Sequence, residues 1–339
     1  MSGDRIRGAF AGLAVGDAAG WPAGRHRSAL HAPWSRRLYR ELDAFAEEHR
    51  VTTLPVPFAL NQPVAPLRIG PSDDAEWLAW TALTIDLRGG RPRAEAFREL
   101  TDVRARISVA TALDNLAKGV EPPASGHDNP HHFDDAAAIR AVAYGAIGRD
   151  PTEDAQVTNA LDGVLGARAM AAAVAEAVAS GQVGRAVEAA LAVLPPDTAI
   201  GHNARAALDA ARAAGDPFAA VPALDAVLLD HVYSYAVGAA QTVPVALALA
   251  EAAGGELGRA VPAAACLAPV ADSAPALTGA LAGACGGFDA IPEGWIASVR
   301  TLAGCCLPDL AGRDLIEVAD NLTSRLTTHH TSHHTEGIA

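Results

Sequence analysis

Residues 4–20 read DRIRGAFAGLAVGDAAG, and glycine recurs in this segment at every fourth position. The four glycines are Gly8, Gly12, Gly16 and Gly20. Because residues four apart lie on the same side of an α-helix, this spacing gathers the glycines on one face. Glycine inside a helix costs about 1 kcal/mol relative to alanine. We therefore expect this face to lie against another backbone, or against a ligand, at very short range.

The composition favours an all-α fold. Half of the 339 residues are hydrophobic, only 5% are aromatic, and alanine, the residue with the highest helix propensity, is abundant. From residue 73 onward, helical segments follow one another with short connectors marked by Gly or Pro. We expect helices at roughly 73–87, 93–118, 134–147, 153–180, 183–194, 202–213, 222–253, 256–268, 272–285, 292–304 and 312–327, and a shorter one at 35–48.

The domain organisation expected from this pattern is simple. Neither a Gly/Ser linker nor an internal repeat divides the chain. We predict one compact domain over residues 1–327 and a disordered, histidine-rich tail over residues 328–339.

Charge and cysteine usage exclude several classes of protein. The net charge of −13 argues against a nucleic-acid partner, which requires a basic face. The N-terminus has no secretory signal, and no charge-free apolar run is long enough to span a membrane. The four cysteines have neither zinc-finger spacing nor the density of a disulfide scaffold. The sequence predicts a soluble, cytoplasmic protein with neither nucleic acid nor membrane as a partner.

Two acidic stretches, Ser72-Asp73-Asp74 and Asp272-Ser273, place carboxylates beside a hydroxyl at the start of an expected helix. Such hard oxygen ligands suit Mg²⁺ or Mn²⁺ better than zinc. A helix N-terminus alone also explains them, with the serine as N-cap and the acids stabilised by the helix dipole. The local sequence leaves both interpretations open.

Four segments, taken in order, resemble the ADP-ribosylglycohydrolase family. The glycine-spaced helix ends in Gly16-Asp17-Ala18-Ala19-Gly20-Trp21-Pro22, similar to the family's Gly-Asp-Ala-x-Gly-x-Pro opening. Ser72-Asp73-Asp74-Ala75-Glu76 resembles its Thr-Asp-Asp-Thr motif, and Ala268–Ser273 resembles its Asp-x-Asp-Thr motif. The segment Phe288–Trp295 is similar to the element that follows in the family. The resemblance extends over residues 5 to 325.

The resemblance implies a compact orthogonal multi-helix bundle with Mg²⁺ or Mn²⁺ between the two acidic motifs. Family members hydrolyse the bond at the anomeric carbon of a ribose, often in ADP-ribosylated arginine or serine. By position, the implied metal ligands are Ser72, Asp73, Asp74, Asp272 and Ser273. The implied catalytic carboxylates are Asp73 and Asp74, one of which would act as general base on a metal-held water. The implied substrate-binding residues are Asp17, Gly20, Asp134, Asp135 and Arg140.

This chain departs from the family pattern at several of these positions. Val270 stands where the C-terminal motif has its first carboxylate, which favours one metal ion over two. Gly24 stands where many members carry a catalytic Glu. Asp134 and Asp135 replace neutral residues in the loop expected to face the substrate diphosphate. Their charge would repel a phosphate, which favours a smaller, neutral or cationic riboside; alternatively, the two acids simply open the helix that follows.

The sequence as a whole predicts a metal-dependent glycosidase that acts on a ribosyl compound, either ADP-ribosyl or a smaller riboside. A binding protein that retains the ribose pocket without turnover, and a purely structural, crystallin-like protein, are the alternatives. Val270 favours these alternatives, whereas Ser72-Asp73-Asp74 together with Asp272 favours the enzyme.

Overall fold

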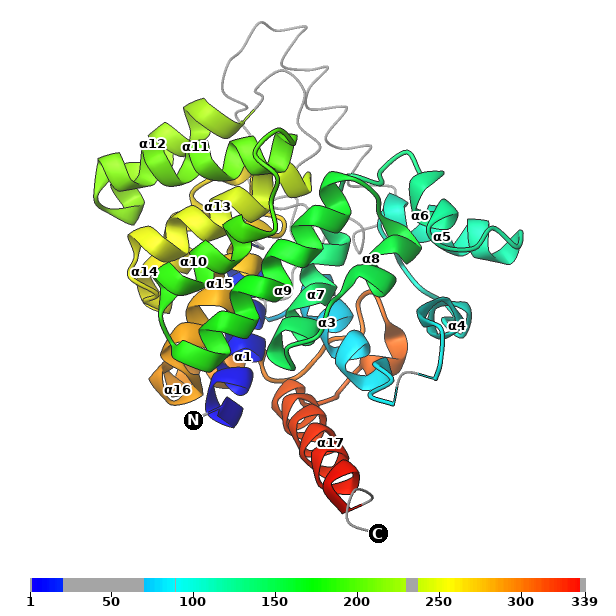
Figure 1. The fold of residues 1–339 in the computed structure, drawn as a ribbon. Coiled ribbons are helices and arrows are strands. Elements are labelled where there is room, and N and C mark those ends of the chain that lie inside the picture. Colours follow the sequence, from blue (N-terminus) through cyan, green and yellow to red (C-terminus); the bar gives the residue numbers. More distant parts are fainter. Residues whose placement is uncertain (1, 21–69, 89, 230–236, 336–339) are drawn as a thin grey trace, which may run out of the picture.

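The computed structural model describes residues 2–20, 70–88, 90–229 and 237–335, and within these ranges the chain forms helices without any strand. Figure 1 shows their arrangement. The helices are α1 (Ser2–Gly20), α3 (Asp73–Thr84), α4 (Arg93–Arg98), α5 (Ile107–Ala117), α6 (Ala124–His127), α7 (Ala136–Ala146), α8 (Thr152–Thr158), α9 (Asp162–Ser180), α10 (Val183–Ala192), α11 (Ala199–Ala214), α12 (Pro217–Leu228), α13 (Ala239–Ala252), α14 (Leu257–Ala265), α15 (Ala274–Gly286), α16 (Glu293–Val299) and α17 (Leu315–Thr335). The predicted all-α class is confirmed.

The centre of the fold is the packing of α1 against α15, the most extensive contact between any two described helices. The two helices run antiparallel in a fixed register, with Gly8 facing Gly283, Gly12 facing Gly279 and Gly16 facing Pro275. At each of these glycines of α1, an added Cβ would overlap a carbonyl group of α15. The predicted close approach is therefore made to another backbone.

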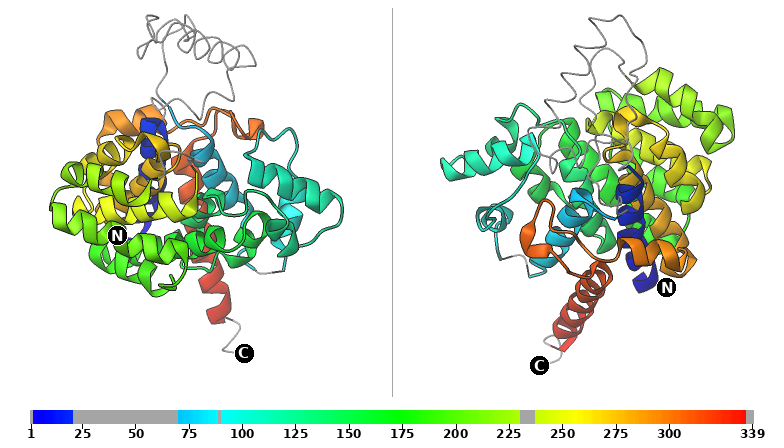
Figure 2. Two further views of the ribbon diagram at one scale, coloured as in Figure 1. Left: turned by 90° about the horizontal axis from the view of Figure 1, so that it is seen from above. Right: turned by 180° about the vertical axis from the view of Figure 1, so that it is seen from behind.

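The other helices surround this pair. α7 packs on α9, α13 lies between α11 and α15, and α3 packs on α7 (Figures 1 and 2). α17 contacts α1 and α3 through its first turns, and its C-terminal end projects away from the body. α9 is long and apolar enough to cross a membrane by length and composition, but just over half of its apolar window (56%) is buried inside the protein, as in a core helix.

Several helix boundaries differ from the prediction. The helix expected at 93–118 is broken between α4 and α5, and the one expected at 153–180 is broken between α8 and α9. At the second break Leu161 has a positive φ of 49°, which a continuous helix does not allow. The last helix, expected at 312–327, is α17 and continues to Thr335. The helix predicted at 35–48 and Gly24 lie outside the described residues.

Candidate active site

The first acidic motif is held by Asp17, near the C-terminal end of α1. The carboxylate of Asp17 accepts hydrogen bonds from the backbone N–H of Ser72 (2.6 Å) and of Ala75 (3.1 Å), and from the Ser72 hydroxyl. Ser72 occupies the N-cap position of α3, yet its side chain makes no cap hydrogen bond. The cap predicted for Ser72 is thus supplied by Asp17 from a different helix, which ties the start of α3 to α1.

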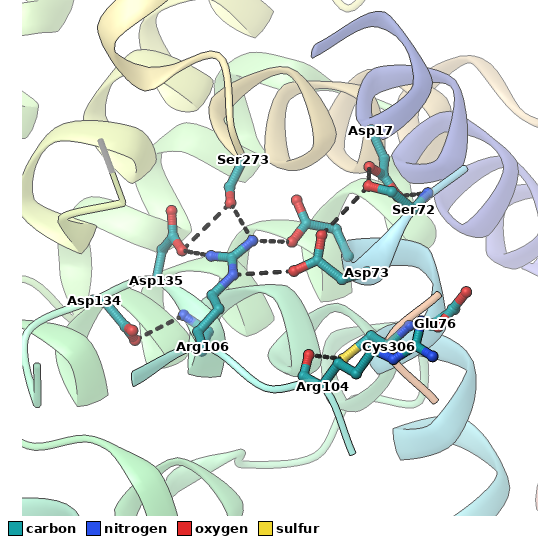
Figure 3. A network of polar contacts seen from close by, with 12 residues as sticks. Asp17, Ser72, Asp73, Glu76, Arg104, Arg106, Asp134, Asp135, Ser273 and Cys306 are labelled. Atoms are coloured by element: carbon teal, nitrogen blue, oxygen red, sulfur yellow. Dashed lines mark hydrogen bonds and ion pairs between the residues drawn. The ribbon is translucent and has the colours of Figure 1, made fainter. Parts of the chain in front are cut away.

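Three of the expected ligands, Asp73, Asp74 and Ser273, contact the guanidinium of Arg106, a residue that the sequence analysis had not singled out (Figure 3). Nη2 donates to Asp74 Oδ1 (2.6 Å) and to the Ser273 hydroxyl (3.0 Å). Nη1 donates to Asp135 Oδ1 (2.6 Å), and Nε donates to Asp73 Oδ2 (3.2 Å). One guanidinium therefore joins the N-terminal ends of α3, α7 and α15.

The electrostatics of this group follow from its burial and its neighbours. Burial alone would lower the pKa of Arg106, but Asp74, Asp73, Asp135 and Asp272 outweigh it and hold that pKa well above its ordinary value. Asp272 therefore lies near the same guanidinium. Burial raises the pKa of Asp135 to about 7, although Arg106 acts in the opposite direction. Asp73, at 17% exposed, is more accessible than Asp74, at 1%.

Glu76 anchors the segment that holds the backbone close to Arg106. Its fully buried carboxylate accepts hydrogen bonds from the backbone N–H groups of Cys305, Cys306 and Leu307, at 2.7 to 2.8 Å. The anchored segment in turn pairs with Arg104, through the Arg104 N–H to the Cys306 carbonyl and the Cys306 thiol to the Arg104 carbonyl. α3, the helix that carries Asp73 and Asp74, therefore also fixes residues 99–106. We call this segment the strap, and Arg106 is its last residue.

Asp134 and Arg140 are both fully buried. Asp134 accepts hydrogen bonds from the Ala136 N–H (3.1 Å) and from the Asn159 side chain (2.8 Å), so it opens α7 as the alternative interpretation predicted. The guanidinium of Arg140 pairs with Asp154 (2.7 Å) and donates to the Thr158 hydroxyl. Oδ1 of Asp134 therefore serves the N-terminus of α7, and the expectation that Asp134 faces a diphosphate stays a prediction.

Two further predicted positions lie where α1 meets the segment before α15. An added Cβ at Gly20 would overlap the Ala271 carbonyl oxygen, so this glycine serves backbone packing. Val270 is fully buried in the apolar core, within a short 3₁₀ turn at Ala268–Val270. The substrate-binding roles expected for Asp17, Gly20 and Arg140 stay predictions.

Comparison with known proteins agrees with this architecture. A sequence profile described as ADP-ribosylglycohydrolase matches residues 2–330. This chain belongs to the ADP-ribosylglycohydrolase family. No curated protein sequence matches the chain. A solved structure described as an ADP-ribosylglycohydrolase-related protein complex is 20% identical, with a TM-score of 0.55, and the match covers 96% of this chain and 97% of that one. At this identity the likeness shows the fold alone.

ADP-ribosylglycohydrolases generally depend on a divalent metal, so the predicted ligands can be tested for their fit to one. Mg²⁺ requires oxygen ligands at about 2.0–2.1 Å in an octahedral arrangement. Here oxygens of Asp73, Asp74 and Ser273 are instead arranged around the guanidinium of Arg106, which fills the point on which they converge. Asp73, Asp74 and Ser273 as arranged do not fit a metal ion at the point that Arg106 occupies.

Proposed function

We propose that this protein hydrolyses the bond at the anomeric carbon of a ribosyl compound. The observation that carries the proposal is the convergence of Asp73, Asp74, Asp135 and Ser273 from three helix N-termini on one spot. The family profile over residues 2–330 supports the reaction class. An oxocarbenium-like transition state carries positive charge at the anomeric carbon, and a site in which carboxylates outnumber the cation favours that charge.

Asp73 is the residue to which we assign the general base. Its carboxylate is partly exposed and makes the longest of the four contacts with Arg106, at 3.2 Å, whereas Asp74 is buried and held at 2.6 Å. In the proposed reaction, water attacks the anomeric carbon and gives a proton to Asp73. The bond to the leaving group breaks, and the leaving group departs with the bonding electrons and takes up a proton. Asp74 and Asp135 hold Arg106 in place.

We propose a leaving group that is neutral or cationic. The surplus of carboxylates around Arg106 supports this, since an anion at this point would be repelled. ADP-ribosyl-arginine and simple nucleosides both satisfy this requirement. An acidic leaving group does not.

The test is a chromatographic assay of the purified protein with ADP-ribosyl-arginine, ADP-ribosyl-serine, nucleosides and ribose 5-phosphate derivatives, each with Mg²⁺ and with EDTA. We expect release of free ribose, ribose phosphate or ADP-ribose, and a loss of at least about 100-fold in Asp73→Asn. Asp114→Asn, which changes an exposed carboxylate on α5, is the matched control and should retain full activity.

A binding protein without turnover is the second candidate, because Arg106 pairs with Asp73, the residue assigned as general base, as well as with Asp74. Calorimetry with ADP-ribose distinguishes the two. Binding of ADP-ribose without product from any substrate would replace the hydrolase proposal by this one.

A further inference from the structure

The group at the centre of the site is a side chain of the protein itself. Arg106 uses four N–H···O contacts to join Asp73, Asp74, Asp135 and Ser273, and it is only 14% exposed. Three of these four partners are positions at which the resemblance implied either a metal ligand or a catalytic carboxylate. One oxygen of each partner is therefore already paired with a cation that cannot diffuse away.

We infer that Arg106 is a tethered cation that takes the place of the divalent metal ion in this member of the family. The inference rests on the same site as the proposed function and names the group that neutralises its carboxylates. A guanidinium offers five N–H donors in one plane, which suits several carboxylates converging from different directions.

Geometry opposes sharing of the site between Arg106 and a metal ion. An ion would need oxygens of Asp73 and Asp74 at roughly 2.1 Å, where these oxygens now lie 2.6 to 3.2 Å from guanidinium nitrogens. An ion held by these same oxygens at the point where the guanidinium lies therefore requires Arg106 to leave. That movement would remove a charged group from its partners and leave the fully buried Asp135 without its ion pair, which is strongly unfavourable.

A second observation, at Val270, points to the same conclusion. The carboxylate that the family places at this position is absent, and the valine is part of the apolar core. The chain therefore has one carboxylate fewer than the family motif implies, and a fixed positive charge lies where its other carboxylates converge. Both features lower the affinity for a divalent cation.

The strap that carries Arg106 is built into the fold. Its backbone is held at Arg104 by the segment 305–307, which Glu76 anchors from α3. Arg106 is the N-cap residue of α5, with an extended backbone that precedes the helix. The cation is therefore positioned by the same helix that supplies Asp73 and Asp74.

The decisive experiment is a Mn²⁺ titration of three proteins, followed by electron paramagnetic resonance or calorimetry. We expect wild type to show no specific site, and Arg106→Ala to acquire one that binds Mn²⁺ at least about tenfold more tightly than wild type. Arg104→Ala removes a guanidinium from the same strap that makes only a 3.5 Å contact with the Cys305 carbonyl, and it should behave as wild type. A stoichiometric Mn²⁺ site in wild type, or no gain in Arg106→Ala, would overturn the inference.

Thermal unfolding provides a second readout. Arg106→Ala should have a lower Tm than wild type, because Asp74 and Asp135 lose their partner, and Mn²⁺ should raise that Tm by about 5 °C at an ion concentration roughly 100 times Kd. The Tm of wild type should change with neither Mn²⁺ nor EDTA. If the alanine variant does not fold, the neutral and similarly long Arg106→Gln takes its place in both measurements. A wild-type Tm that falls in EDTA would contradict the inference.

These measurements do not depend on turnover, so the two proposals can fail separately. If no substrate is cleaved but Arg106→Ala binds Mn²⁺, the tethered-cation inference is supported and the hydrolase proposal is contradicted. If product forms only when Mg²⁺ or Mn²⁺ is added to wild type, the hydrolase stands and the tethered cation falls.

Discussion

Gly12 of α1 and Gly279 of α15 face each other so closely that a Cβ added to either would overlap the carbonyl oxygen of the other. The contact is reciprocal, and the pair of Gly8 and Gly283 repeats it one turn away. The two helices are thus in backbone contact along their length. Asp17 lies at one end of α1 and Ser273 at the start of α15. This contact therefore also positions these two residues of the candidate site relative to each other.

Gly12→Ala should destabilise the protein by about 3 kcal/mol or more, since neither backbone can move without disturbing a fully packed core. Urea unfolding followed by circular dichroism measures the change. Gly258→Ala is the matched control, because this exposed helical glycine has open space around its Cβ position. Its free energy of unfolding should equal that of wild type or exceed it by up to about 1 kcal/mol. Equal effects of the two substitutions would show that the close contact is not required.

Glu76→Gln should cost about 2–3 kcal/mol of stability. The amide nitrogen of glutamine cannot accept the hydrogen bonds that the second carboxylate oxygen receives, so at least one buried N–H in the segment 305–307 loses its partner. Glu95→Gln, in an exposed ion pair with Arg91, should change stability by less than about 0.5 kcal/mol. A Glu76→Gln protein as stable as wild type would mean that Glu76 is not the anchor of this segment.

Asp154→Asn should cost about 3–5 kcal/mol at pH 7, because Arg93 and Arg140 would be left buried without a carboxylate. Burial alone would raise the pKa of Asp154, but the two arginines outweigh it and hold that pKa below its ordinary value. The unfolded chain has a pKa of about 3.9 at this residue. The stabilisation is therefore fully present above that pH and is lost as the pH falls toward the lower folded pKa.

The pH dependence of the unfolding free energy tests the role of this ion pair. The difference in unfolding free energy between wild type and Asp154→Asn should shrink between neutral pH and about pH 3. Asp197→Asn, at an exposed position, is the control and should follow wild type throughout. A difference that stays constant with pH would contradict the role given to the ion pair.

Val270→Asp should destabilise the fold by about 3 kcal/mol or more, because it introduces a buried carboxylate into the apolar core. Val270→Ala removes volume without adding charge and should cost only about 2 kcal/mol. Both values come from urea unfolding at pH 7. If Val270→Asp is as stable as wild type and binds Mn²⁺, its side chain faces the site, as the resemblance to the family implied.

The helical fold and a close approach at the glycine face of residues 4–20 could be predicted from the sequence, because helical periodicity is a local property. The four-residue glycine spacing in residues 4–20 fixes which atoms share a face, and the structure places that face against α15. The positions of Ser72, Asp73 and Asp74 at a helix start followed from local sequence in the same way. The breaks at 99–106 and at 159–161 did not, because tertiary contacts overrode a continuous helical pattern.

The group at the centre of the site was decided by the tertiary structure alone. Nothing in the sequence around Arg106 marks it, since an arginine before a helix is ordinary and its partners are far away in the chain, up to 167 residues in the case of Ser273. Its position depends on Glu76, which anchors the segment 305–307 against the strap. Whether carboxylates from separate helices meet a metal ion or a guanidinium depends on which chain segment the packing brings to their meeting point, and helical periodicity carries no information about that.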